Sequence, residues 1–143
     1  MNHASGNKSV TKAAASVAAS ATHSHEIDTL GFKYAAIDVV FSPFTAATAA
    51  YASVLKVQES DASGSGQADV TGLSITAGAG ATTGFSVGAV ARFNVDLRGR
   101  KRYLTVVTSP GNTVAIASNA RLSKAEQHAV TATENGVNNV ANL

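Results

Sequence analysis

The sequence predicts an all-β fold, a small antiparallel β-sandwich or barrel-like domain with an extended N-terminal arm and a C-terminal tail. Apolar and polar residues alternate in several short segments, and glycine, proline, aspartate and serine separate these segments. No long segment has the apolar spacing of an amphipathic helix. About five or six strands of this kind are typical of a small sandwich or barrel.

Length and composition limit the class of protein. The chain has 143 residues and no cysteine, which predicts one domain without disulfides or thiolate chemistry. Much of its 45% hydrophobic content is alanine, which buries little area, so we expect a small core. The net charge of +2 is too balanced for a general nucleic-acid binder. No apolar run approaches the roughly 20 residues that span a membrane. We therefore expect neither nucleic acid nor a membrane as a partner.

The two ends of the chain differ in composition from its centre. Residues 1–26 carry no aromatic residue and, beyond Met1, no aliphatic residue larger than valine, so we expect an arm that is disordered when free. The alanines of residues 11–21 would form a short helix only on a neighbouring surface. Residues 123–143 are polar and asparagine-rich, which predicts a tail that is mobile or held by another chain. The β-sandwich domain is expected at residues 27–122.

The first half of this domain contains two clear strands. Residues 32–42 alternate between apolar and polar side chains, and Pro43 ends the strand. Residues 53–60 alternate in the same way. Residues 62–91 hold most of the chain's 12 glycines, so this region is predicted to be long loops with one or two weak strands.

The segment 92–108 is predicted to form two strands joined by a sharp turn, a hairpin around which the domain is organised. Apolar and polar residues alternate from Arg92 to Leu97, and the second strand is rich in β-branched residues, which is typical of a strand buried on both faces. Gly99 supplies the positive φ that such a turn requires. After a turn at Pro110, residues 113–122 are predicted to form the last strand.

The turn of this hairpin is the most specific polar feature of the chain. Its cations, which we call the basic corner, are the candidate partner-binding residues Arg98, Arg100, Lys101 and Arg102. One interpretation is a solvated turn whose arginine stems cover the edge of the core. Another is an electrostatic contact with an acidic protein surface. Binding of nucleic acid is the least favoured, because only Tyr103 offers an aromatic ring beside the cations.

Motifs for catalysis or ligand binding are weak. Gly84–Gly88 matches G-x-S-x-G, and Asp96 and His128 follow in the order of an α/β-hydrolase triad, but that enzyme needs a strand before the motif and a helix after it. His23 and His25 lack a third ligand, so we expect a solvated pair. We therefore expect no catalytic residue, no metal, no cofactor and no enzymatic activity.

Three segments of the domain, taken in their order along the chain, indicate a family resemblance. They are Ile27–Tyr34 (Ile-Asp-Thr-Leu-Gly-Phe-Lys-Tyr), Leu55–Asp61 (Leu-Lys-Val-Gln-Glu-Ser-Asp) and Asp96–Leu104 (Asp-Leu-Arg-Gly-Arg-Lys-Arg-Tyr-Leu). In this order, residues 27–122 resemble a group of small virion proteins of tailed bacteriophages, commonly encoded near the major capsid gene. The strongest marks are the strand end Gln58–Asp61 and the strand start Arg100–Leu104. Neither is a catalytic motif, so they identify a scaffold.

The resemblance implies a β-sandwich bound to the capsid exterior of a virion, as a decoration or cement protein made in the cytoplasm of a bacterial host. Its partner would be the major capsid protein, and it would cement neighbouring capsid subunits, with the arm and tail reaching across seams. The basic corner would face acidic capsid surface, which makes attachment salt-sensitive. By analogy the protein would be a homo-oligomer, for example a trimer.

Two alternatives to a cement protein stay open. One is a head–tail or tail-associated β-sandwich protein of the virion. The other is a virion-surface module that binds a host glycan, although a chain with no tryptophan and three tyrosines is poorly equipped for that task.

Overall fold

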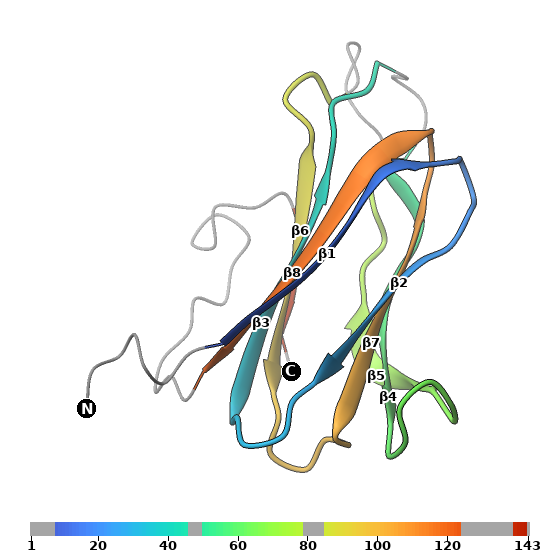
Figure 1. The fold of residues 1–143 in the computed structure, drawn as a ribbon. Coiled ribbons are helices and arrows are strands. Elements are labelled where there is room, and N and C mark those ends of the chain that lie inside the picture. The colour runs from blue at the N-terminus through green and yellow to red at the C-terminus, as the bar shows by residue number, and fades with distance from the viewer. Residues whose placement is uncertain (1–7, 46–49, 79–84, 124–138, 143) are drawn as a thin grey trace.

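The computed structural model describes residues 8–45, 50–78, 85–123 and 139–142. These residues form nine strands and no helix, and the strands make two sheets that pack face to face (Figure 1). This arrangement confirms the predicted all-β class and is a β-sandwich.

Each sheet combines strands from distant parts of the sequence. The five-stranded sheet has the order β1 (Lys8–Val17), β8 (Val114–Ser123), β3 (Tyr34–Phe41), β6 (Ala89–Asp96) and β9 (Asn139–Asn142). The four-stranded sheet has the order β2 (His23–Asp28), β7 (Tyr103–Pro110), β4 (Ala52–Ser60) and β5 (Ala68–Ser74). All neighbours are antiparallel except β6 and β9, which are parallel.

The core lies between the sheets and comes from alternate residues of each strand. In β3, Ile37, Val39 and Phe41 are buried while their neighbours face outward, as the alternation predicts. Both faces of β7 are largely buried, which confirms the prediction for that strand. One end of the core is closed by aromatic rings, with centroids 5.2 Å apart for Phe41 and Tyr51.

The prediction of an N-terminal arm outside the domain is wrong for the residues that the structure describes. β1 pairs along β8 and β2 pairs along β7, so residues 8–17 and 23–28 are outer strands of the two sheets, and 11–21 hold no helix. An outer strand gains its backbone hydrogen bonds from one neighbour and needs few large side chains. In β1 only Val17 is buried. Residues 1–7 lie outside the described part of the chain.

The prediction that the strands on either side of Gly99 pair as a hairpin is also wrong. Both strands exist, but β6 pairs with β3 and β9, whereas β7 pairs with β2 and β4. The turn between them therefore crosses from one sheet to the other (Figure 1). Gly99 has the expected positive φ, 81°. This conformation reverses the chain locally and does not decide which strand becomes the hydrogen-bonding partner.

The regions predicted as loop and tail each contain a short strand. β5 lies within residues 62–91 and buries Val70 and Leu73, so the expected weak strand is present. The tail prediction is wrong at residues 139–142, which pair with β6 of the same chain. Residues 124–138 and 143 are outside the described ranges.

Candidate functional site

Every cation of the basic corner has a carboxylate partner within the chain. The pairs are Arg98 with Asp96, Arg100 with Glu59, Lys101 with Asp61 and Arg102 with Asp28, at N–O distances of 2.5, 3.6, 2.8 and 2.7 Å. Two guanidinium groups also lie over aromatic rings, Arg98 over Tyr34 and Arg102 over Tyr103. The corner is therefore balanced in charge, although the sequence around it is strongly basic.

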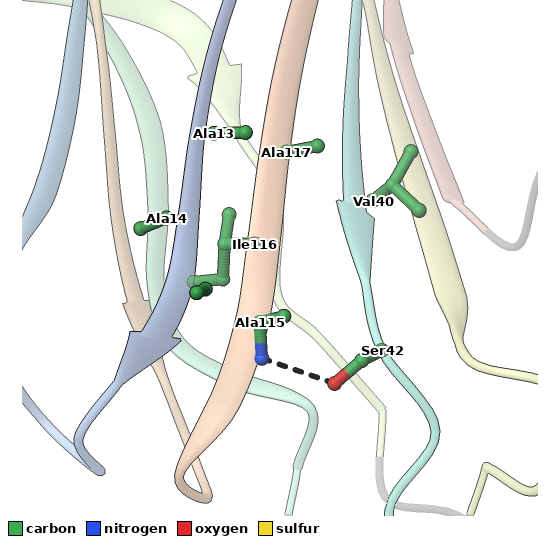
Figure 2. Close-up of a pocket in the computed structure, with 8 residues that line it drawn as sticks. Ala13, Ala14, Val40, Ser42, Ala115, Ile116 and Ala117 are labelled. Atoms are coloured by element: carbon green, nitrogen blue, oxygen red, sulfur yellow. Dashed lines mark hydrogen bonds between the residues drawn. The ribbon is translucent and has the colours of Figure 1, made fainter.

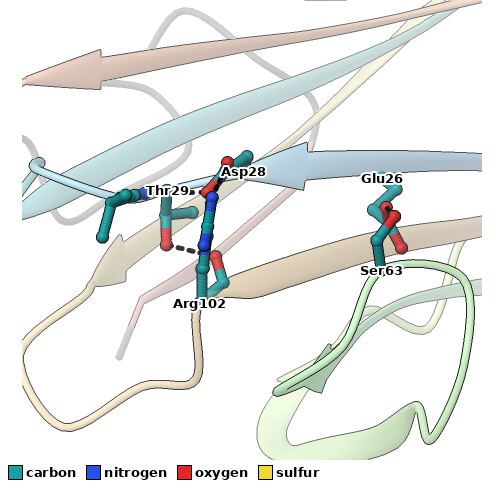
Figure 3. A network of polar contacts seen from close by, with 6 residues as sticks. Glu26, Asp28, Thr29, Ser63 and Arg102 are labelled. Atoms are coloured by element: carbon teal, nitrogen blue, oxygen red, sulfur yellow. Dashed lines mark hydrogen bonds and ion pairs between the residues drawn. The ribbon is translucent and has the colours of Figure 1, made fainter.

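The ion pair of Arg102 belongs to a network that holds β2 in place (Figure 3). The Thr29 hydroxyl donates to the Arg102 carbonyl at 2.7 Å, next to the pair of Arg102 with Asp28. The hydrogen bonds from Arg102 and from the Leu30 N–H lower the pKa of Asp28 to about 2. These contacts tie the outer strand of one sheet to the turn between the sheets.

A second contact holds β2 to the loop after β4. The Ser63 hydroxyl and the Gly64 N–H donate to the two carboxylate oxygens of Glu26, at 2.5 and 2.7 Å (Figure 3). These two hydrogen bonds lower the pKa of Glu26. The loop therefore reaches across the outside of the four-stranded sheet.

The two strongest marks of the phage resemblance meet in space. Where β4 ends and β7 begins, Ser60 lies opposite Tyr103 and Glu59 lies opposite Leu104. The Lys101 N–H donates to Glu59 Oε2 at 3.2 Å, beside the ion pairs of Glu59 and Asp61. The two segments, which are far apart in sequence, thus form one contact between the neighbouring strands β4 and β7. Their role in this contact is structural.

Cations without an ion pair to any described residue lie elsewhere. Lys8, Lys33 and Arg121 are exposed and lie at the same end of the five-stranded sheet. Lys8 lies opposite Leu122 and Arg121 opposite Ser9 in the register of β1 and β8, and the Lys33 N–H donates to the Ser123 carbonyl. This group could not be predicted from the sequence, because its members are single cations in separate segments.

An apolar surface lies on the outside of the five-stranded sheet, toward the other end of β1 and β8 from these cations. A shallow groove of about 450 Å³ crosses β1, β8 and β3, and its lining consists of Ala13, Ala14, Ala15, Val40, Ser42, Ala115, Ile116 and Ala117 (Figure 2). Val40 keeps 40% of its surface exposed. None of the described residues that line the groove is charged. We call this surface the alanine face.

The hydrolase-like residues that the structure describes form no recognisable site. Ser86 lies in an exposed turn, and Asp96 binds Arg98, while Gly84 and His128 fall outside the described residues. Within the described ranges, no group of three or more side chains of the metal-binding types comes together.

The two histidines are not the solvated pair that the sequence predicts. His23 and His25 are 6% and 3% exposed, because β2 turns this side of the strand toward the other sheet. A polar residue can occupy a core position of an outer strand, and composition alone does not reveal it.

Known proteins offer no further guide. Comparisons with protein-family models, with curated proteins and with solved structures found no match. In the part of the chain that the structure describes, no helix has the length and apolar character needed to cross a membrane.

Proposed function

We propose that this protein is a structural component of a tailed-phage virion, which binds the major capsid protein on the outer capsid surface and cements neighbouring subunits. The resemblance of residues 27–122 to small phage virion proteins motivates the proposal. The single structural observation that supports it is the alanine face, an apolar groove on the outside of a small β-sandwich.

The alanine face is the better candidate for the capsid contact than the basic corner. The corner cations are engaged by Asp28, Glu59, Asp61 and Asp96, so a partner would have to displace these carboxylates. The alanine face is apolar, and Arg121 lies further along β8 on the same side of the sheet, two outward positions beyond Ala117, which suits a capsid surface that is apolar with an acidic residue at its rim.

The test is co-sedimentation of the purified protein with capsids that lack it, at increasing salt concentration. Cementing predicts saturable binding at a stoichiometry set by the capsid lattice. Contact through the alanine face predicts a shallow salt dependence, whereas contact through the basic corner predicts a steep loss of binding as salt rises. Absence of binding at every salt concentration would exclude the capsid and direct attention to the tail and connector.

Self-association belongs to the same proposal, and a trimer is the form expected by analogy. Light scattering coupled to size-exclusion chromatography measures the mass directly. A monomer both free and on the capsid would contradict this part of the proposal without affecting capsid binding.

The positions of the tyrosines support a glycan-binding module less well than a capsid-binding protein. Tyr51 is 1% exposed, and Arg98 and Arg102 lie over the rings of Tyr34 and Tyr103, at 5.6 and 5.0 Å from the ring centres. Carbohydrate sites usually present an open aromatic face. Specific binding on a glycan array would revive this alternative.

A further inference from the structure

Two histidines fill core positions where the outer strands β1 and β2 of the two sheets face each other. His23 and His25 alternate with the exposed Ser24, so both rings lie on the same face of β2 as the buried Ile27. Polar rings therefore occupy a place where the rest of the sandwich uses aliphatic side chains.

The two rings are unequally satisfied. His25 Nδ1 shares a hydrogen bond of 3.0 Å with the Ser118 hydroxyl of β8, which links the two sheets. Both ring nitrogens of His23 are buried without a hydrogen-bond partner among the described residues, and so is the hydroxyl of Thr108, which lies opposite His23 on β7. Buried polar groups without partners weaken the structure around them.

The charged group facing these rings is a cation. Lys12 of β1 lies beside Ser118 in the register of β1 and β8, and its Nζ donates to the Ser24 carbonyl of β2 at 2.7 Å. The inward residues of β7 and β8 at this seam are uncharged, among them Thr108, Val106, Ser118 and Ala120. The acidic residues of β2 bind elsewhere, Glu26 to the loop after β4 and Asp28 to Arg102.

These surroundings oppose protonation of both rings. Burial, then His23 and then Lys12 lower the pKa of His25 from 6.5 to about 4. Burial and, to a smaller extent, Lys12 lower the pKa of His23. Among the residues that the structure describes, no carboxylate contributes a compensating attraction to either ring.

We propose that His23 and His25 form a proton-operated latch, which keeps β1 closed on β2 while both rings are neutral and releases β1 in mildly acidic solution. β1 is the strand that leaves, because it pairs only with β8 among the described strands and buries only Val17. Its departure exposes both rings to water and leaves the cores of β3, β6, β7 and β4 intact. This inference concerns the free protein and does not depend on capsid binding.

The direction of the effect follows from proton linkage. The open state binds protons with an ordinary pKa near 6.5, whereas His25 in the closed state binds them only near 4. The open state is therefore favoured increasingly as the pH falls from 6.5 toward 4. For His25 alone, linkage predicts about a 20-fold rise in the open population between pH 7 and pH 5.

Hydrogen exchange of the full chain at pH 7 and pH 5, corrected for intrinsic exchange rates, tests the latch. We expect amides of β1 to lose protection by about 20-fold or more, while amides shared by β3 and β6 change little. Unchanged protection of β1 would overturn the proposal. An equal loss in β3 and β6 would also overturn it, because that result indicates global unfolding.

Two variants assign the effect. His23→Gln combined with His25→Gln removes both titrating groups and should abolish the response of β1 to pH. Asp28→Asn changes an acidic residue of the same strand that binds Arg102, and the response should persist. Persistence of the response in the glutamine variant would contradict the latch. If that variant fails to fold, NMR titration of the wild-type chain decides: a His25 pKa near 4 supports the latch and one near 6.5 overturns it.

Discussion

Asp28 and Arg102 join an outer strand to the turn between the two sheets, with Nε and Nη2 of Arg102 lying 2.9 and 2.7 Å from the two carboxylate oxygens of Asp28. Both side chains are substantially exposed, so the pair fixes geometry more than it adds stability.

The first prediction concerns the pKa of Asp28, which is about 2 in the intact protein. Arg102→Gln removes the largest cause of this shift, so the pKa should rise toward 3.8. Because the folded pKa is depressed, the stabilising contribution of Asp28 is present above its unfolded pKa and is lost as the pH falls through about 2. NMR titration of the carboxyl carbon measures the change. Arg98→Gln is the matched control, since Arg98 binds Asp96, and it should leave the Asp28 pKa unchanged.

The second prediction concerns the core. Phe93 of β6 is fully buried between the sheets, so Phe93→Ala should lower the free energy of unfolding by about 3–5 kcal/mol. Val87 is 93% exposed, and Val87→Ala should change it by less than about 0.5 kcal/mol. Chemical denaturation of both variants makes the comparison. Equal effects would show that Phe93 does not lie in the core.

The third prediction concerns Gly88, which precedes β6. Its φ is +82°, and a Cβ at this position would overlap the carbonyl oxygen of Phe41. Gly88→Ala should therefore destabilise the fold by more than about 1 kcal/mol, the cost of the left-handed conformation alone. A Cβ on Gly78 meets nothing within 4 Å, so Gly78→Ala serves as the control in the same unfolding assay. Wild-type stability in Gly88→Ala would contradict this account of the turn.

Strands with large apolar residues could be predicted from the sequence, and strands without them could not. β3, β4, β7 and β8 can be predicted because they are rich in β-branched and large apolar residues, which alternate with polar or small ones in β3, β4 and β8 and occur on both faces of β7. β1 lacks this alternation: most of its positions are exposed, and its lysine, serine, threonine and alanine side chains carry little hydrophobic signal. In β2 the inward positions are His23, His25 and Ile27, so two of the three looked polar.

The charge balance of the basic corner could not be predicted from the sequence for a different reason. Arg102 and Asp28 are 74 positions apart, and Lys101 and Glu59 are 42 apart. Local sequence shows the cations together but not the carboxylates that the fold brings to them. The alanine face could not be predicted for the same reason, because Ala13–Ala15 and Ala115–Ala117 become neighbours only through the pairing of β1 with β8.

The fourth prediction tests the proposed capsid contact with two exposed valines. Val40 lies on the alanine face and is 40% exposed, and Val54 lies on β4 of the other sheet and is 37% exposed. A carboxylate at either position remains in contact with water, so neither substitution should unfold the protein. Thermal unfolding of both variants verifies this point before binding is measured.

The decisive measurement is co-sedimentation of Val40→Asp and Val54→Asp with capsids that lack the protein. A contact through the alanine face predicts at least about a tenfold weaker affinity for Val40→Asp, because a charge would be buried against an apolar surface. It predicts wild-type affinity for Val54→Asp. Equal affinities for Val40→Asp and the wild type would show that the alanine face does not bind the capsid.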